Sequence, residues 1–397
     1  MDYTELQTPC YIINQSDYEQ NIQDLMLAFE SRWQGPVLYG YSVKTNHCPH
    51  LFQTAMKYGW MGEVVSPDEY EFVKSCGCPE HHIIYNGPQK RDSVLTACRA
   101  GAIVNLDNLE EVTLVAQGLT ETEKQHSTIG IRINYDLEAE CPGETTCRDV
   151  VGRFGISYEN GDVEKAIHLL KNAGIPIRGL HMHQSSSSRS LRIYESLSKK
   201  AIEIINRYAL TDLTYIDIGG GFFGGNFFPG KPNIDQYAQT ICSILKSGVD
   251  SQRITLILEP GAAILSTSMD YLVSVLNLRN IRGKKVVTVD GSVVHINPFM
   301  NPHPTPFTII NPGEDIGIER AREQIIGGST CMEMDRIYPR DIRHEVTSET
   351  RMLFHCCGAY MSTHNSSFIN AAPHIYIKEN HSFRMLRKKD PAQMLTY

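Results

Sequence analysis

The sequence predicts a closed (β/α)8 barrel of the TIM type, followed by a C-terminal all-β domain shaped as a sandwich or small barrel. Two observations predict the barrel. Between about residues 36 and 260, short apolar runs alternate with amphipathic stretches of helical length, and there are about eight such runs. A third observation, the Pro- and Gly-rich turns between strand-like runs after residue 265, predicts the all-β part. A doubly wound sheet shares the alternation and is the structural alternative.

The apolar runs of the first part are short and bounded by turn residues, as buried parallel strands are. The expected strands are residues 37–43, 61–65, 82–85, 102–105, 128–133, 177–182, 213–218 and 254–258. Some helices between them carry start signals, such as Ser66-Pro67 before residues 68–75 and Asp107-Asn108 at the start of residues 106–116. The two longest periodic stretches are residues 191–208 and 234–246.

The second part of the chain is predicted to contain strands separated by turns. The expected strands are residues 272–276, 285–289 and 374–377. Residues 8–13 also have the pattern of a strand, and this strand can pair with the C-terminal ones because it precedes the first barrel helix. We therefore expect a barrel at residues 27–264 and a discontinuous β-domain made of residues 1–26 and 265–397.

The composition argues against several classes of partner and site. The net charge of −8 disfavours nucleic acid, and no apolar stretch approaches the roughly 18–20 residues that span a bilayer. The N-terminus lacks the features of a signal peptide, so we expect a cytoplasmic protein whose 11 cysteines stay reduced. The Cys/His clusters at residues 47–50 and 76–82 lack the spacing of structural zinc sites, so no metal is expected.

Polar residues that are unusual in a core follow the expected strands. Lys44 stands at the end of the first strand, where partial desolvation can make a lysine amine nucleophilic. The others are Glu63, Asn86, Arg132, His183 with Ser186, Asp217 with Gly219, Gly220 and Gly221, and Glu259. Each alone could be a capping or packing residue. Because the C-terminal ends of all barrel strands open onto one face, we expect these side chains to meet there.

Three of these features match the needs of one cofactor. The glycine run 219–221 lets backbone amides approach a phosphate, and the hydroxyl of Ser186 can reach the same group. A carboxylate such as Glu259 at a partly buried strand end needs a cationic partner, which a protonated pyridine nitrogen provides. With a lysine for the aldehyde, the set indicates pyridoxal phosphate. His183 either stacks on the cofactor ring or is a satisfied core histidine.

These residues lie in motifs that resemble the barrel-type (fold type III) pyridoxal-phosphate-dependent amino acid decarboxylases, which include the diaminopimelate, ornithine and arginine decarboxylases. The motifs, in the family's order, are YSVKTN at 41–46, EVVS at 63–66, RFGI at 153–156, GLHMHQSS at 179–186, DIGGGF at 217–222 and EPG at 259–261. The resemblance implies an alanine racemase-like barrel in which Lys44 anchors the cofactor and His183 lies on its ring. It also implies that Ser186 and the glycines bind the phosphate, and that Glu259 faces the pyridine nitrogen.

Two more motifs fall in the expected β-domain. The segment 328–335 (GSTCMEMD) resembles the motif whose cysteine, here Cys331, reaches into the active site of the other subunit. The segment 358–360 (GAY) resembles the motif whose tyrosine, here Tyr360, lies near the phosphate. The resemblance thus implies a homodimer with shared active sites. The catalytic residues that it implies are Lys44, Cys331, His183 and Glu259.

Three departures from the family's pattern concern the ligands. Ala262 stands where the family usually has an arginine near the phosphate, a non-acidic residue follows Cys331, and no arginine follows Asp290-Gly291. The residues expected to bind the substrate are Met332, Glu333, Asp335 and, in the loop 295–306, His295. We therefore expect a small amino-acid-like substrate other than plain diaminopimelate, from a specialised pathway such as siderophore biosynthesis.

The expected reaction is decarboxylation of an amino acid or of an amino-acid-derived substrate, with Cys331 or an adjacent acid reprotonating the α-carbon. An amino acid racemase is the first alternative, but racemases of this fold place an arginine at the pyridine nitrogen, where this chain has Glu259. A non-catalytic pyridoxal-phosphate-binding homologue is the second. Such homologues usually lose the lysine or the cysteine, whereas Lys44 and Cys331 are both present.

Overall fold

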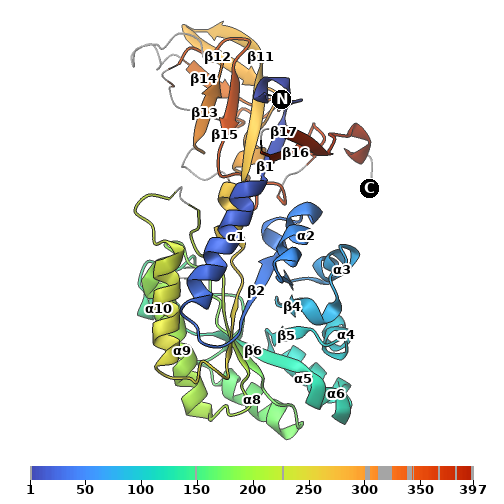
Figure 1. The fold of residues 1–397 in the computed structure, drawn as a ribbon, viewed down its shortest axis with the longest axis vertical. Coiled ribbons are helices and arrows are strands. Elements are labelled where there is room, and N and C mark those ends of the chain that lie inside the picture. The colour runs from blue at the N-terminus through green and yellow to red at the C-terminus, as the bar shows by residue number, and fades with distance from the viewer. Residues whose placement is uncertain are drawn as a thin grey trace. The chain divides into compact units, whose positions relative to one another are not determined.

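The computed structural model describes residues 2–147, 150–225, 228–299, 305–311, 324–337, 342, 344–364, 367–380 and 382–394 (Figure 1). The chain divides into two compact units, one of Asn21–Ile264 and one that combines Met1–Gln20 with Leu265–Tyr397. The first unit is built on parallel strands and the second on a mostly antiparallel sheet, so the predicted fold class is confirmed.

Eight parallel strands of the first unit close into a barrel. They are β2 (Val37–Ser42), β3 (Met61–Val64), β4 (Ile83–Tyr85), β5 (Ile103–Leu106), β6 (Thr128–Asn134), β8 (Gly179–His181), β9 (Tyr215–Gly219) and β10 (Thr255–Leu258). Their order is β5-β4-β3-β2-β10-β9-β8-β6, and pairing of β5 with β6 closes the ring. A short ninth strand, β7 (Ile156–Ser157), pairs with the end of β6. All eight predicted strands are present.

Helices precede, connect and follow the barrel strands. They are α1 (Gln15–Glu30), α2 (Pro49–Lys57), α3 (Pro67–Ser75), α4 (Ser93–Arg99), α5 (Leu109–Gly118), α6 (Glu121–His126), α7 (Leu137–Glu140), α8 (Asp162–Asn172), α9 (Leu191–Tyr208), α10 (Ile234–Lys246) and α11 (Gly261–Leu265). The Ser66 side chain caps α3 by accepting from the Glu69 amide, and Asn108 caps α5 in the same way. Among the described residues, no helix combines the length and the apolar character needed to cross a membrane.

Two local predictions differ from the structure. The helix expected at 106–116 begins at Leu109, because Leu106 still pairs with Ile131 in the barrel and Asn108 supplies the cap. The strand expected at 37–43 ends at Ser42. Lys44 instead lies in a single 3-10 turn, η2 (Val43–Thr45), directly after β2. The other 3-10 segments are η1 (Tyr3–Glu5), η3 (Glu80–His82), η4 (Ser266–Ser268) and η5 (Pro391–Met394).

The large ring of Tyr215, from β9, lies inside the barrel. Tyr215 is buried with Met61, Ile84, Ile103 and Ile257 in one apolar cluster. The phenol has room only because two neighbouring strands carry glycine: a Cβ at Gly130 or Gly179 would overlap the Tyr215 side chain. The core is therefore packed rather than hollow, and the functional groups lie at its rim.

The second unit is a sheet that combines strands from the N-terminal and C-terminal parts of the chain. Its strands are β1 (Cys10–Asn14), β11 (Met269–Ile281), β12 (Lys284–Val289), β13 (Phe307–Ile310), β14 (Gln324–Gly327), β15 (Arg351–Phe354), β16 (His374–Glu379) and β17 (Ser382–Arg387), with one short helix, α12 (Val293–Ile296). The main order is β13-β15-β11-β1-β16-β17. The N-terminal strand β1, blue in Figure 1, lies between β11 and β16, which confirms that it pairs with C-terminal strands.

Candidate active site

Lys44 points its amine at a buried carboxylate. Its Nζ forms a short ion pair with Oε2 of Glu63, the residue near the end of the next strand, β3. The Glu63 side chain is almost completely buried, whereas about a third of Lys44 is exposed. Ser42 donates to the same carboxylate oxygen at 2.6 Å. The strand ends therefore hold the lysine side chain in one direction.

A single amide joins Glu63 to a second carboxylate. The Nδ2 group of Asn86, which follows β4, donates to Glu63 Oε1 at 3.0 Å and to Glu259 Oε1 at 2.5 Å. The Asn86 Oδ1 atom accepts from Asn105 Nδ2 at 2.8 Å, and Tyr215 donates to Asn105 Oδ1 at 2.8 Å. Because the amide oxygen already accepts from Asn105, both hydrogens of the amine group face the carboxylates.

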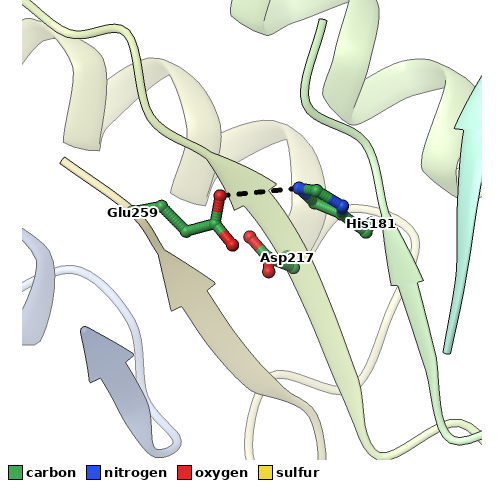
Figure 2. Close-up of side chains that lie close together, drawn as sticks. All are labelled: His181, Asp217 and Glu259. Atoms are coloured by element: carbon green, nitrogen blue, oxygen red, sulfur yellow. Dashed lines mark ion pairs between the residues drawn. The ribbon is translucent and has the colours of Figure 1, made fainter. Parts of the chain in front are cut away.

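Glu259 lies among buried titratable groups at the ends of β8, β9 and β10. Figure 2 shows it beside His181 and Asp217, with His181 Nε2 at 3.5 Å from Glu259 Oε2. Burial acts to raise the pKa of Glu259, but the neighbouring His181 and Lys44 hold that pKa well below its usual range. Glu259 is therefore a carboxylate at neutral pH, as a partner for a protonated ring nitrogen must be.

His183 follows β8 and carries a neutral ring. Its ring is nearly parallel to that of His181, with an interplanar angle of 12°. Burial, followed by the nearby charge of Arg132, lowers the pKa of His183 to about 3. Arg132 also donates to the His183 carbonyl at 3.1 Å and pairs with Asp107 at 3.3 Å. A neutral imidazole fixed in this way is suited to stack on a flat cofactor ring.

The glycine run after β9 fits closely against its neighbours. Gly219 and Gly221 have positive φ angles of 76° and 87°, in the region that favours glycine. A Cβ at Gly219 would overlap the His183 ring, and a Cβ at Gly220 would overlap the Glu259 carbonyl. Only glycine therefore lets this backbone pass so close to both residues.

Ser186 lies in the loop after His183. Its hydroxyl donates to the Glu144 carbonyl at 3.0 Å and accepts from the Arg189 amide at 2.9 Å. The hydroxyl proton thus serves a loop contact in this structure. The expected contact of Ser186 with a phosphate stays a prediction.

A cavity of about 730 Å³ opens beside Arg132 and His183. Its remaining lining residues lie between 134 and 160 and at 184–185, in the segments that follow β6 and β8. A cavity of this size is typical of small-molecule sites.

The other expected site residues belong to the second unit. Cys331 and Glu333 are exposed, Met332 is partly buried, and Tyr360 is partly buried with a φ of 67°. Asp335 is buried, and its carboxylate accepts three hydrogen bonds, from the Val293 amide and from the amide and hydroxyl of Thr330. These bonds fix the segment that carries Cys331, independently of any role of Asp335 in substrate binding.

His295 is also buried in the second unit. It contacts the Tyr271 hydroxyl through Nδ1, its carbonyl accepts from Tyr11 at 2.7 Å, and burial lowers its pKa to about 4. Residues 300–304 of its loop lie outside the described residues. Substrate binding by His295, Met332, Glu333 and Asp335 stays a prediction.

Some residues of the site received no role from the sequence. Glu63, Asn86 and Asp217 were noticed only as polar residues at strand ends, and His181 only as part of a motif. The signal that could have found them is the polar residue itself, since a buried carboxylate or amide inside an apolar run must have a partner.

Comparison with known proteins identifies the family of this chain. The sequence model of the pyridoxal-dependent decarboxylases, pyridoxal binding domain, matches residues 19–266. The diaminopimelate decarboxylase of Aquifex aeolicus is 25% identical, over 96% of this chain and 89% of the relative. The L-glutamyl-[BtrI acyl-carrier protein] decarboxylase of Niallia circulans is 24% identical, over 97% and 92%.

Solved structures share the fold. Diaminopimelate decarboxylase from Helicobacter pylori, complexed with L-lysine, has a TM-score of 0.82 at 20% identity, covering 99% of this chain and 97% of that one. Lysine/ornithine decarboxylase from Vibrio vulnificus, complexed with cadaverine, has a TM-score of 0.74 at 21% identity, covering 91% and 90%. Since the family's sequence model spans the whole barrel unit and more than half of the chain, this protein belongs to the pyridoxal-dependent decarboxylases, enzymes that use pyridoxal phosphate.

Proposed function

We propose that this protein decarboxylates an amino-acid-derived substrate at the mouth of its barrel, with Lys44 as the cofactor anchor. The single observation that carries the proposal is the chain of contacts from Lys44 through Glu63 and Asn86 to Glu259. This chain of contacts joins a lysine amine to a carboxylate whose pKa is held low, and pyridoxal phosphate requires one such group for its aldehyde and the other for its ring nitrogen.

The residues present fit the cofactor. The backbone of the glycine run 219–221 passes so close to His183, whose ring is neutral, and to Glu259 that a Cβ at Gly219 or Gly220 would overlap them. We assign the aldehyde to Lys44, the ring face to His183, the ring nitrogen to Glu259, and the phosphate to the glycines with Ser186 and Tyr360. When bound, the cofactor supplies an electron sink for the bond that breaks at the α-carbon.

The protein's own groups carry out the remaining steps. Glu63 orients the Lys44 amine, which would hold the aldehyde until the amine of the substrate displaces it. The Glu259 carboxylate would accept a hydrogen bond from the protonated ring nitrogen. We assign delivery of a proton to the α-carbon to Cys331 of the second copy in a homodimer, and we propose that the enzyme acts in the cytoplasm. Carbon dioxide and an amine then leave.

The substrate proposal rests on the chain's departures from the family's pattern. Ala262 adds no cation near the phosphate, and no arginine follows Asp290-Gly291 to receive a distal carboxylate. The relative from Niallia circulans is named for a carrier-linked glutamyl group. We therefore propose a modified or carrier-linked amino acid, of the kind used in specialised pathways such as siderophore biosynthesis.

One experiment separates the possible activities. Carbon dioxide release is measured against lysine, ornithine, diaminopimelate, glutamate and glutamate thioesters. Release from a derivative at a higher kcat/KM than from the free amino acids supports the proposal, and preference for diaminopimelate contradicts the substrate part. Exchange of the α-hydrogen without carbon dioxide release would instead indicate a racemase. Retained cofactor with no turnover would indicate a non-catalytic homologue.

The anchor is tested by absorption spectroscopy. The wild-type protein is expected to be yellow, and Lys44→Ala to lose the long-wavelength band of the lysine-bound cofactor together with turnover. Lys199→Ala, in an exposed part of α9, is the matched control and should keep both. A Lys44→Ala variant that keeps the band would contradict the role of Lys44.

A further inference from the structure

Two buried carboxylates face each other at the barrel mouth. Asp217 lies on β9 and is fully buried, and Glu259 follows the neighbouring strand β10 and is 5% exposed (Figure 2). One carboxylate oxygen of each residue and one ring nitrogen of His181 all lie within 4.8 Å of one another. Two ionised carboxylates this close repel each other strongly when water is excluded. The pair is therefore more stable when one of the two carboxylates is protonated.

Glu259 and Asp217 differ in the hydrogen bonds that they accept. Glu259 accepts from Asn86 Nδ2 at 2.5 Å and lies 3.5 Å from His181 Nε2. Asp217 accepts only the backbone amide of Gly219, at 2.8 Å on Oδ1, and its buried Oδ2 atom has no hydrogen-bond partner among the described residues. A buried ionised oxygen without a donor is costly, whereas a protonated oxygen needs only an acceptor, which Glu259 provides.

We propose that Asp217 carries a proton on Oδ2 at neutral pH and directs it at Glu259, which makes Asp217 a positioning residue for the Glu259 carboxylate. The inference rests on the proposed function in one respect, the assignment of Glu259 to the ring nitrogen of the cofactor. The location of the proton itself rests on the geometry of the pair alone.

The surrounding charges agree with this assignment. Burial, followed by the negative charge of Glu259, raises the pKa of Asp217 well above its usual range. Burial also lowers the pKa of His181, which opposes a positive charge on the ring beside Asp217. The other titratable or charged groups that act on the three residues are Lys44, Glu63, Arg132, His183 and Tyr215. Lys44 and Arg132 are paired with Glu63 and Asp107, respectively.

The proton has a consequence for the cofactor. If Asp217 were ionised, its charge would drive a proton onto Glu259, and a protonated Glu259 could no longer hold a proton on the ring nitrogen. With the shared proton kept on Asp217, the negative charge stays on the residue that Asn86 orients.

Infrared spectroscopy of the holoenzyme tests the proposal without reference to turnover. The wild type is expected to show the carbonyl band of a buried protonated carboxylic acid at neutral and mildly alkaline pH, and Asp217→Asn is expected to lose it. Glu69→Gln is the matched control. Burial raises the pKa of Glu69 to about 7, so that residue contributes a separate band that disappears above this pH. A wild-type band that persists in Asp217→Asn overturns the proposal.

Glu259→Gln provides a second test if Asp217→Asn does not fold. Removing the negative charge of Glu259 should let Asp217 ionise more easily, so that the midpoint of the remaining carbonyl band moves to lower pH. Loss of the band from Glu259→Gln at every pH at which the wild type shows it, with no midpoint at lower pH, would place the proton on Glu259 and overturn the inference. The expected bands without turnover on any substrate would instead contradict the proposed function alone.

The cofactor's absorption gives an independent readout of positioning. Asparagine at position 217 keeps a neutral donor toward Glu259, so the pH dependence of the cofactor band should remain as in the wild type. Asp217→Ala loses the donor, and its cofactor band should show loss of ring-nitrogen protonation at a lower pH. Equal pH profiles for Asp217→Ala and the wild type would contradict the positioning role.

Discussion

Asn86 donates both of its amide hydrogens to carboxylates at the barrel mouth, one to Glu63 and one to Glu259. Glu63 pairs with Lys44 and Glu259 is the proposed partner of the ring nitrogen, so one side chain relates the direction of Lys44 to the position of Glu259. Asn105 donates to the amide oxygen of Asn86 and in turn accepts from Tyr215. The Asn86 amide can therefore donate to both carboxylates in only one orientation.

The first prediction is that Asn86→Ala lowers kcat/KM by about 10- to 100-fold. Loss of a hydrogen bond to a buried charged group costs about 1.5–3 kcal/mol, and each 1.4 kcal/mol corresponds to about a factor of ten in rate. Asn86→Asp should be worse than Asn86→Ala, because it adds a third carboxylate between two others. Steady-state kinetics and cofactor retention on dialysis measure both effects. An Asn86→Asp variant with wild-type kinetics would contradict the assigned contacts.

The second prediction concerns acid stability. The folded-state pKa of His183 is about 3, below the ordinary value of 6.5. Between these values the unfolded chain binds a proton at this position and the folded chain does not. The free energy of unfolding should therefore fall as the pH is lowered below 6.5, by at most about 1.4 kcal/mol per pH unit from this residue.

His183→Phe should remove this contribution, because phenylalanine cannot titrate. His168→Asn is the control, since His168 is exposed on α8 and its side chain is 68% accessible. Urea unfolding at several values between pH 7 and pH 5 measures the slope for each variant. An unchanged slope in His183→Phe would show that the ring accepts a proton in the folded state.

The sequence located the candidate site at the level of single residues only in part. Lys44 and Glu259 could be predicted because each is a charged residue that follows an apolar run and lies in a motif. The bridge by Asn86 could not, because it joins side chains from strands that are far apart in the sequence and meet only when the barrel closes. The proton on Asp217 depends on the same closure.

At the scale of elements, the apolar runs located all eight barrel strands, because burial on both faces gives parallel strands a continuous apolar pattern. The ends of elements were harder to predict. Because Leu106 still pairs with Ile131, α5 begins later in the chain than predicted. The strand β2 ends at Ser42, before Lys44. The two-residue strand β7 is too short to have a periodic signal.

The third prediction is made for the loop after β9. Gly220→Ala should weaken cofactor binding about tenfold or more, since its Cβ would overlap the backbone carbonyl of Glu259 and overpacking costs about 1–3 kcal/mol. Gly327→Ala is the control, because the nearest atom to its Cβ would lie at 3.5 Å, an ordinary contact. Titration of the apo-protein with pyridoxal phosphate gives both affinities. Equal affinities would show that the loop shifts without cost.

At the scale of the whole molecule, the proposed homodimer completes each site with Cys331 of the second copy. The fourth prediction is that Lys44→Ala and Cys331→Ala are each nearly inactive, and that mixing them in equal amounts restores about a quarter of wild-type activity. Half of the randomly assorted dimers are hybrid, and each hybrid has one intact site of two. Decarboxylation after mixing and equilibration measures the recovery.

A pair of barrel variants controls the mixing experiment. Lys44→Ala and Glu259→Ala both damage the barrel unit, so every hybrid site still contains one defect and no activity should return. Recovery with this pair, or none with Lys44→Ala and Cys331→Ala, would contradict shared sites.

The position of β1 in the sheet of the second unit has a consequence for how the chain is made. On the ribosome, β1 emerges before the barrel, but its neighbours β11 and β16 follow only after the barrel sequence has been synthesised. The barrel unit is therefore an insertion that can fold while the first strand waits, and closing so long a loop carries an entropic cost that the folded barrel reduces. Truncation before Asn14 should thus leave the barrel able to form and deprive the other unit of a central strand.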